Sequence, residues 1–195
     1  MPSYAERQKY RKPPKSLFLV VNTAYFDINS HRLEFQKMIK IMFVCHGNIC
    51  RSPMAEFIFK DLLKKEGLKD KFFVLSSATS TEEIYNGVGN LVYPPSKEEL
   101  NLHNISCEGK RAVQLRRADS DDYDYFIGMD SYNINNMKRI LNSNAHSKIY
   151  KLLDFTKNSR DVSDPWYTRD FKKCYNDIYE GCIALLDYIK KAHAI

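Results

Sequence analysis

Apolar and polar positions change along the chain in blocks that predict strands and helices in turn. Short apolar runs of four to six residues have the length and composition of buried strands. The segments between and after them repeat apolar residues every three or four positions, which is the spacing of one helical face. The predicted strands are residues 40–44, 72–76, 124–129 and 148–152, and the predicted helices are residues 53–66, 94–103, 131–141 and 171–191.

This alternation predicts an α/β fold with a single domain. Strands that alternate with helices are typical of a parallel sheet whose two faces are both covered by helices. We therefore expect a parallel four-stranded sheet, with the ligand site at the carboxyl ends of its strands. The last helix is expected to pack on the core through a stripe with 4,3,4,3,4 spacing. Its residues are Phe171, Tyr175, Ile178, Cys182, Leu185 and Ile189.

Charge separates the first part of the chain from the rest. Residues 1–37 hold seven Lys or Arg and three acidic residues, so they carry +4 of the formal net charge of +6. We interpret them as an N-terminal extension, flexible or peripheral, and residues 38–195 as the catalytic domain. The nearly balanced charge of that domain argues against a nucleic-acid partner. The chain has no apolar run of about 18 residues, so no membrane span is expected.

Cysteine and histidine usage limits the chemistry further. Five cysteines, an odd number, in a chain without a recognisable secretory signal favour reduced thiols and a cytoplasmic location. The five histidines are scattered, without the paired spacing of zinc ligands. We therefore expect neither a metal nor a cofactor.

The loop between the first predicted strand and the first predicted helix carries the clearest chemistry. It begins at Cys45, directly after the apolar run 41–44, and ends at Arg51, before the helix-start pair Ser52-Pro53. Free N–H groups and the dipole at a helix N-terminus favour an anion, and an arginine fork can hold two phosphoryl oxygens. Positive surroundings also make a thiolate available near neutral pH. These features predict a phosphate-binding loop in which sulfur attacks phosphorus.

The spacing Cys-x5-Arg alone is common by chance, and a buried cysteine followed by a surface arginine would give it too. The full string Val44-Cys45-His46-Gly47-Asn48-Ile49-Cys50-Arg51-Ser52-Pro53 is far more specific. It resembles the signature of the low-molecular-weight protein tyrosine phosphatases, bacterial type, and the resemblance extends over residues 39–191. It implies hydrolysis of phosphotyrosine in proteins, and of small aryl phosphates, through a cysteinyl-phosphate. The expected partner is a phosphotyrosine-containing protein, and the expected assembly a monomer or weak dimer.

The resemblance implies a role for each residue of the site. Cys45 is the expected nucleophile, and Arg51 with the loop N–H groups holds the phosphoryl oxygens. Asp164, which could also belong to an ordinary Asp-Pro turn, matches the general acid of the family. Trp166 and Tyr167 would then line an aromatic slot. The residues expected to bind phosphate or substrate are His46, Gly47, Asn48, Ile49, Cys50, Ser52, Tyr85, Trp166 and Tyr167.

Several of these residues have a second reading. Ser52 is expected to donate its hydroxyl to the thiolate, to cap the helix, or to do both. Asn48 is expected to shape the loop. Cys50 is a small loop residue or, as in the family, a redox partner that forms a reversible disulfide with the nucleophile. Ser76 and Asp130 match supporting positions of the family, although Asp130 also suits a helix cap.

The chain departs from the family pattern at several points. The stretch 79–86 is longer than in eukaryotic members, so the slot wall is expected to differ. Lys110 stands where a histidine often supports the phosphate loop, which puts that support in question. His46 stands where many relatives have an apolar residue, and we expect it to tune substrate preference.

Three other functions compete with this one. Protein arginine phosphatases resemble this chain but tend to carry Thr at the position of Ile49. An arsenate reductase of the same fold needs a further close cysteine pair, which Cys107, Cys174 and Cys182 do not offer. A non-enzymatic phosphate-binding module would lack the nucleophile, the arginine or the acid, and all three are present.

Overall fold

The computed structural model describes residues 24–26, 33–35 and 38–195. The chain divides into two compact units, Met1–Lys37 and Met38–Ile195. In the first unit, β1 (Ala24–Phe26) pairs with β2 (Leu33–Phe35) in an antiparallel ladder. Apart from these two strands, the interpretation of residues 1–37 as a flexible or peripheral extension lies outside the described residues.

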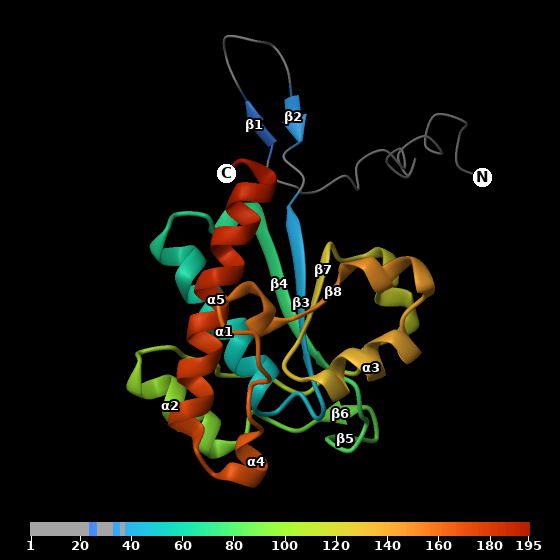
Figure 1. Cartoon of the computed structure of the whole chain (residues 1–195), viewed down its shortest axis with the longest axis vertical. Helices are drawn as coiled ribbons and strands as arrows, with labels where there is room; N and C mark the ends of the chain where they lie inside the picture. The colour runs from blue at the N-terminus through green and yellow to red at the C-terminus, as the bar shows by residue number, and fades with distance from the viewer. Residues whose placement is uncertain (1–23, 27–32, 36–37) are drawn as a thin grey trace, which may run out of the picture. The chain divides into compact units, whose positions relative to one another are not determined.

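The sheet of the second unit is parallel throughout, with the strand order β4-β3-β7-β8 (Figure 1). The strands are β3 (Ile39–Cys45), β4 (Phe72–Ala78), β7 (Tyr125–Gly128) and β8 (Ile149–Lys151). Each strand ends within two residues of its predicted bounds. The predicted parallel four-stranded sheet is therefore confirmed.

Strand β3 has helices on both sides because its two faces belong to different apolar clusters. Side chains alternate along a strand, so Ile41 and Phe43 join the larger cluster, whereas Met42 and Val44 join the smaller one. A strand buried on both faces reads as one continuous apolar run, which is why this segment was recognisable in the sequence. Because these side chains are buried on both faces, the strand is held in place up to its last residue, Cys45.

Helices from distant parts of the chain cover these two faces. The larger cluster includes residues of α1, α2 and α5, and the smaller one includes Met137 of α3. The α/β arrangement with helices on both faces is confirmed. No helix in the described part of the chain is long and apolar enough to span a membrane. The helices are α1 (Arg51–Lys65), α2 (Pro94–Leu102), α3 (Ser131–Ile140), α4 (Pro165–Thr168) and α5 (Phe171–His193).

The apolar stripe predicted for the last helix is largely buried. Five of its six residues are buried along α5, and Phe171 at its first turn is half-buried against the ring of Tyr93. Cys174 and Leu186 are buried as well. This face holds α5 against α1 and so fixes the segment that leads into α5 from α4.

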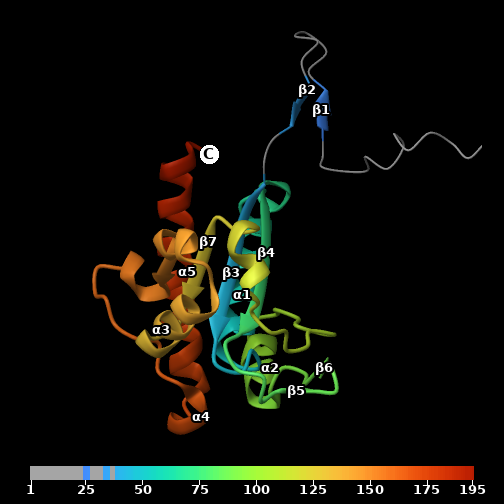
Figure 2. The same cartoon turned by 90° about the vertical axis from the view of Figure 1, so that its right-hand side faces the viewer.

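Two short elements that the sequence pattern did not predict lie beyond the carboxyl ends of the strands (Figure 2). One is the helix α4, and the other is the hairpin of β5 (Ile84–Tyr85) and β6 (Val88–Gly89). Both are too short to show a hydrophobic period. The hairpin turns at Asn86 and Gly87, whose φ angles of 51° and 78° are left-handed, and an Asn-Gly pair suits such a turn. These elements flank the site.

A chain that begins at Met38 is expected to fold. Among the described residues, both apolar clusters are built entirely from residues of the second unit. We expect the melting temperature of the truncated chain to lie within about 4 °C of the full chain, which corresponds to about 1 kcal/mol. Calorimetry of the two purified chains measures this difference. An insoluble truncated chain, or a much larger fall in melting temperature, would show that residues 1–37 are part of the fold.

Candidate active site

The loop from Cys45 to Arg51 joins the end of β3 to the start of α1. The helix begins at Arg51, two residues before the predicted start, and Cys50 occupies the N-cap position without a side-chain cap. The free N–H groups and the positive end of the helix dipole therefore face the space next to the Cys45 sulfur. The backbone N–H of Asn48 also donates to that sulfur, at 3.3 Å. The loop is built to attract negative charge.

Ser52 lies inside the first turn of α1, so its alternative reading as the N-cap is not borne out. It is fully buried, and its hydroxyl oxygen lies 3.0 Å from the Cys45 sulfur. Cys50, with φ −122° and ψ −89°, is the last non-helical residue before α1. The serine hydroxyl is thereby directed at the sulfur rather than at the helix end.

Asn48 shapes the loop through its backbone and its side chain. Its φ of 58° is left-handed, a conformation that asparagine tolerates better than most residues. Its amide nitrogen donates to the hydroxyls of Ser52 and Ser76, both at 2.8 Å. Its amide oxygen accepts the N–H of Val113 at 3.0 Å. The orientation of this buried amide is therefore fixed at both ends.

A buried ion pair sets the direction of these hydrogen bonds. The Ser76 hydroxyl donates to Glu56 at 2.6 Å, and Lys110 forms an ion pair with the same Glu56 oxygen at 3.0 Å. Since Ser76 donates to the carboxylate, its oxygen is left to accept from Asn48. Lys110 also donates to the Ser76 carbonyl at 3.0 Å. Lys110, where the resemblance led us to expect a histidine, therefore anchors the loop through Glu56.

The same reasoning extends to the sulfur. Because Ser52 accepts from Asn48, its own proton is free to point at Cys45, and the other nearby acceptor, the Ser77 carbonyl, is farther away at 3.4 Å. A hydroxyl that donates to a thiolate stabilises the charged form. The chain of hydrogen bonds from Glu56 thus ends on the nucleophilic atom.

Arg51 connects the loop to two carboxylates. It is only 3% exposed, and its terminal nitrogens lie 2.5 Å from Asp130 and 2.6 Å from Asp164. Burial lowers the pKa of the guanidinium, but Cys45, Asp164 and Asp130 outweigh it, so the pKa is raised overall. Asp130 uses its other oxygen to cap α3 through the N–H of Asn133, at 2.7 Å. Asp130 therefore contacts Arg51 and caps α3 at the same time.

Asp164 caps α4 and faces Arg51 at the same time. One carboxylate oxygen accepts the N–H of Trp166 at 3.0 Å, and the other binds Arg51. Trp166 packs against the ring of Tyr93 at 5.3 Å between centroids, and the N–H of Tyr93 donates to the carbonyl of Ile49 at 2.8 Å. The Asp-Pro-aromatic segment is therefore tied to the phosphate loop. Tyr93 was not predicted, since its role depends on contacts between distant segments.

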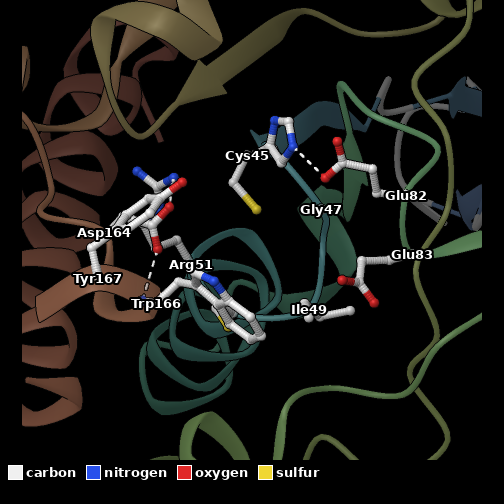
Figure 3. Close-up of a pocket in the computed structure, with 11 residues that line it drawn as sticks. Cys45, Gly47, Ile49, Arg51, Glu82, Glu83, Asp164, Trp166 and Tyr167 are labelled. Carbon is white, nitrogen blue, oxygen red and sulfur yellow. Dashed lines mark hydrogen bonds and ion pairs between the residues drawn. The ribbon is translucent and has the colours of Figure 1, made fainter. Parts of the chain in front are cut away.

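The phosphate loop, the segment that begins at Asp164 and the residues before β5 surround one cavity of about 250 Å³ (Figure 3). Asp164, Trp166 and Tyr167 form one side, Glu82 and Glu83 form the other, and the sulfur of Cys45 lies between them. The full lining is Cys45, His46, Gly47, Ile49, Cys50, Arg51, Glu82, Glu83, Asp164, Trp166 and Tyr167.

Some residues predicted to bind substrate lie outside this lining. Asn48 and Ser52 contact Cys45, and the predicted supporting residue Asp130 contacts Arg51, without lining the cavity themselves. The other predicted supporting residue, Ser76, reaches the loop through Asn48. Tyr85, predicted as an aromatic wall, is 65% exposed and does not line the cavity. It pairs with Val88 in the hairpin, and Glu82 and Glu83, which precede the hairpin, line the cavity instead.

Cys50 lines the cavity as a protonated thiol. Burial raises its pKa to about 12, and the negative charges of Cys45 and Asp164 add to this effect. The positive charge of Arg51 acts in the opposite direction without cancelling it. All five cysteines are free thiols in the structure.

A parallel sheet with a cysteine-and-arginine loop at the carboxyl end of its first strand, facing an aspartate, defines the class of phosphatases that use a cysteine thiolate. The sequence profile of the family described as "Low molecular weight phosphotyrosine protein phosphatase" matches residues 40–194. The chain belongs to this family.

Individual relatives agree with this assignment. The chain is 41% identical over 156 residues to "Low molecular weight protein-tyrosine-phosphatase YfkJ" of Bacillus subtilis (strain 168), covering 79% of this chain and 97% of that protein. The crystal structure of YfkJ superimposes with a TM-score of 0.75 at 40% identity, covering 80% and 97% of the two chains. The structure of SP-PTP, described as a low molecular weight protein tyrosine phosphatase from Streptococcus pyogenes, gives a TM-score of 0.66 at 37% identity, covering 77% and 93%.

The hydrogen bond from Ser52 to sulfur predicts the reactivity of Cys45. Replacing Ser52 with Ala removes the donor, so we expect alkylation of Cys45 by iodoacetate at pH 6 to slow by about tenfold, the effect of a charge-assisted hydrogen bond. Mass spectrometry of the labelled peptide measures the rate.

Ser77→Ala is the matched control. Ser77 is buried beside Ser76, and its hydroxyl has no hydrogen-bond partner among the described residues. The control should react like the parent protein. Equal rates in the Ser52 and Ser77 variants would show that the Ser52 hydroxyl does not stabilise the thiolate.

Proposed function

We propose that this protein hydrolyses phosphotyrosine in proteins, and small aryl phosphates, through a cysteinyl-phosphate intermediate. One observation carries the proposal: a thiol, an arginine and a carboxylic acid line a single cavity, with the thiol at the N-terminus of α1. Each group has a separate task in the reaction. Membership of the family supports the assignment.

In the first step, the phosphoryl oxygens bind to the N–H groups of the loop and to Arg51. The sulfur of Cys45 attacks phosphorus, an S–P bond forms, and the bond between phosphorus and the tyrosine oxygen breaks. A phenolate has a pKa of about 10, so the departing oxygen needs a proton near neutral pH. Asp164 supplies that proton from the side of the cavity that faces the sulfur.

Arg51 couples phosphate binding to the acid. In the structure its two terminal nitrogens are shared between Asp130 and Asp164. A phosphoryl group that takes the nitrogen facing Asp164 releases this carboxyl group for the leaving oxygen. Asp130 keeps its own contact, and because it also caps α3, it holds Arg51 in place during the exchange.

In the second step, Asp164 acts as a base. Its carboxylate takes a proton from a water molecule, and the oxygen of that water attacks phosphorus. The S–P bond breaks, inorganic phosphate leaves, and Cys45 returns to the thiolate. Ser52 stabilises the sulfur as it regains its charge, since its hydroxyl lies 3.0 Å away.

The walls of the cavity suit an aromatic ring. Ile49, Trp166 and Tyr167 all line it, so a phenyl group can lie between aliphatic and aromatic surfaces while its phosphate reaches the loop. The aliphatic side chain at position 49 favours phosphotyrosine over phosphoarginine. Serine and threonine phosphates lack the ring that these walls would bind.

Cys50 protects Cys45 from irreversible oxidation by forming a reversible disulfide with it. Peroxide converts the Cys45 thiolate to a sulfenic acid, the Cys50 thiol attacks that sulfur, and a disulfide and water form. Reduction by a cellular thiol restores both cysteines. This cycle needs a reducing compartment, and we propose that the protein acts in the cytoplasm.

The role of Asp164 predicts a dependence on the leaving group. In Asp164→Ala, kcat for phosphotyrosine should fall by about 10²- to 10⁴-fold, the usual contribution of a general acid. Formation of the cysteinyl-phosphate from p-nitrophenyl phosphate should fall far less, because nitrophenolate departs without a proton. Rapid-mixing kinetics of the first step, across a series of aryl phosphates, measures how the rate depends on the pKa of the leaving group.

Asp161→Ala tests whether any nearby carboxylate has this effect. Asp161 lies three residues away, pairs with Lys151 and does not line the cavity. This variant should keep the leaving-group dependence of the parent protein. Equal losses across the series in Asp164→Ala would exclude Asp164 as the acid.

A further inference from the structure

The cavity wall that faces Asp164 and the two aromatic residues is acidic. Glu82 and Glu83 form it, and both side chains lie on the opposite side of the Cys45 sulfur from Asp164 and Trp166 (Figure 3). They come from the segment between β4 and β5. Two carboxylates at the mouth of a cavity for a phosphate group require an explanation.

Both carboxylates are held in position by the surrounding structure. Glu82 accepts from the imidazole of His46 at 2.8 Å, and Glu83 accepts from the side chain of Asn90 at 2.7 Å. The stem of Glu83 lies so close to Gly47 that a Cβ atom on that glycine would be 3.0 Å from it. The Asn90 N–H also donates to the Glu83 carbonyl at 2.8 Å, which closes the base of the hairpin. The wall is therefore a built surface.

Among the described residues, neither carboxylate of this wall forms an ion pair with a lysine or an arginine, and Arg111, the basic residue that contacts the hairpin, donates to the carbonyl of Gly89 at 2.9 Å. The two lysines on the adjoining surface are paired elsewhere, Lys97 with Glu108 at 2.6 Å and Lys110 with Glu56 at 3.0 Å. Arg51 is bound to two other carboxylates, and Arg169 lies over the ring of Trp166 on the far side. Even with His46 protonated, Glu82 and Glu83 together leave a net negative charge.

Such a wall repels the phosphate itself. A phosphoryl group carries close to two negative charges, and carboxylates at the cavity mouth raise the energy of bringing it in. The wall therefore disfavours substrates that carry only the phosphate. It favours substrates that place a positive charge beside the phosphorylated residue. Among the described residues, one oxygen of each carboxylate has no hydrogen bond and is open to a further donor.

We propose that Glu82 and Glu83 bind a lysine or arginine side chain of the substrate polypeptide next to the phosphotyrosine, an inference that rests on the function proposed above. The side chain of Glu82 is 72% exposed, so a long cationic side chain can reach it from solvent. The preferred substrates are then phosphotyrosine segments of basic character.

The experiment compares three phosphotyrosine peptides that differ only in the flanking residues, which are Lys, Gly or Glu. The parent protein should show kcat/KM values that fall in that order, and the difference should shrink with added salt. Each of Glu82→Gln and Glu83→Gln should reduce the preference for the Lys peptide over the Gly peptide by about 3- to 5-fold, the effect of one exposed ion pair. Glu98→Gln, an exposed change on α2 away from the cavity, is the matched control.

For a small aryl phosphate, the Gln variants should change kcat/KM in the opposite direction. p-Nitrophenyl phosphate carries no cation, so removing a carboxylate should raise its kcat/KM, while the same change lowers kcat/KM for the Lys peptide. A general disturbance of the cavity would lower both. Equal kcat/KM values for the three peptides with the parent protein, or parallel losses on every substrate in the Gln variants, would overturn the inference. Failure to hydrolyse any of the three peptides while p-nitrophenyl phosphate is cleaved would instead overturn the proposed function.

Discussion

The contact of Arg51 with two carboxylates holds the site together. A buried guanidinium is costly to desolvate, and two partly buried carboxylates compensate its charge. Asp130 follows β7, Asp164 precedes α4, and Arg51 opens α1, so this residue joins three segments far apart in the sequence. The same arginine is the group that a phosphoryl oxygen would bind. Folding of the pocket and binding of the anion thus depend on one side chain.

A second buried network orients the nucleophile. Glu56 and Lys110 form its fixed end, and the Ser52 hydroxyl forms the end that meets sulfur. A carboxylate can only accept hydrogen bonds, so the direction of every hydroxyl and amide between the two ends follows from it. The departure from the family pattern at Lys110 therefore keeps the support of the loop, with an ion pair in place of the expected histidine.

The parts that could be predicted from the sequence are those encoded by neighbouring residues. The buried strand β3 reads as an apolar run, and Cys45 and Arg51 are close enough in sequence to be seen as one loop. Contacts between distant segments gave no such signal, and Tyr93 was missed for that reason. Tyr85 was assigned to the wall by resemblance to the family, and a short hairpin has no hydrophobic period that would have shown which of its residues point inward. Resemblance, not pattern, pointed to Asp164.

The central claim is that the sulfur of Cys45 receives the phosphoryl group. Asp164→Ala slows release of that group, since it lacks the base that activates water. Rapid acid quench of this variant with a small aryl phosphate, followed by mass spectrometry, should find one phosphoryl group on the peptide that contains Cys45. In the double variant Asp164→Ala/Cys45→Ser, no phosphoryl group should be found on a sulfur atom of that peptide. A phosphoryl group on another residue, or turnover by Cys45→Ser at the rate of the parent protein, would contradict the account.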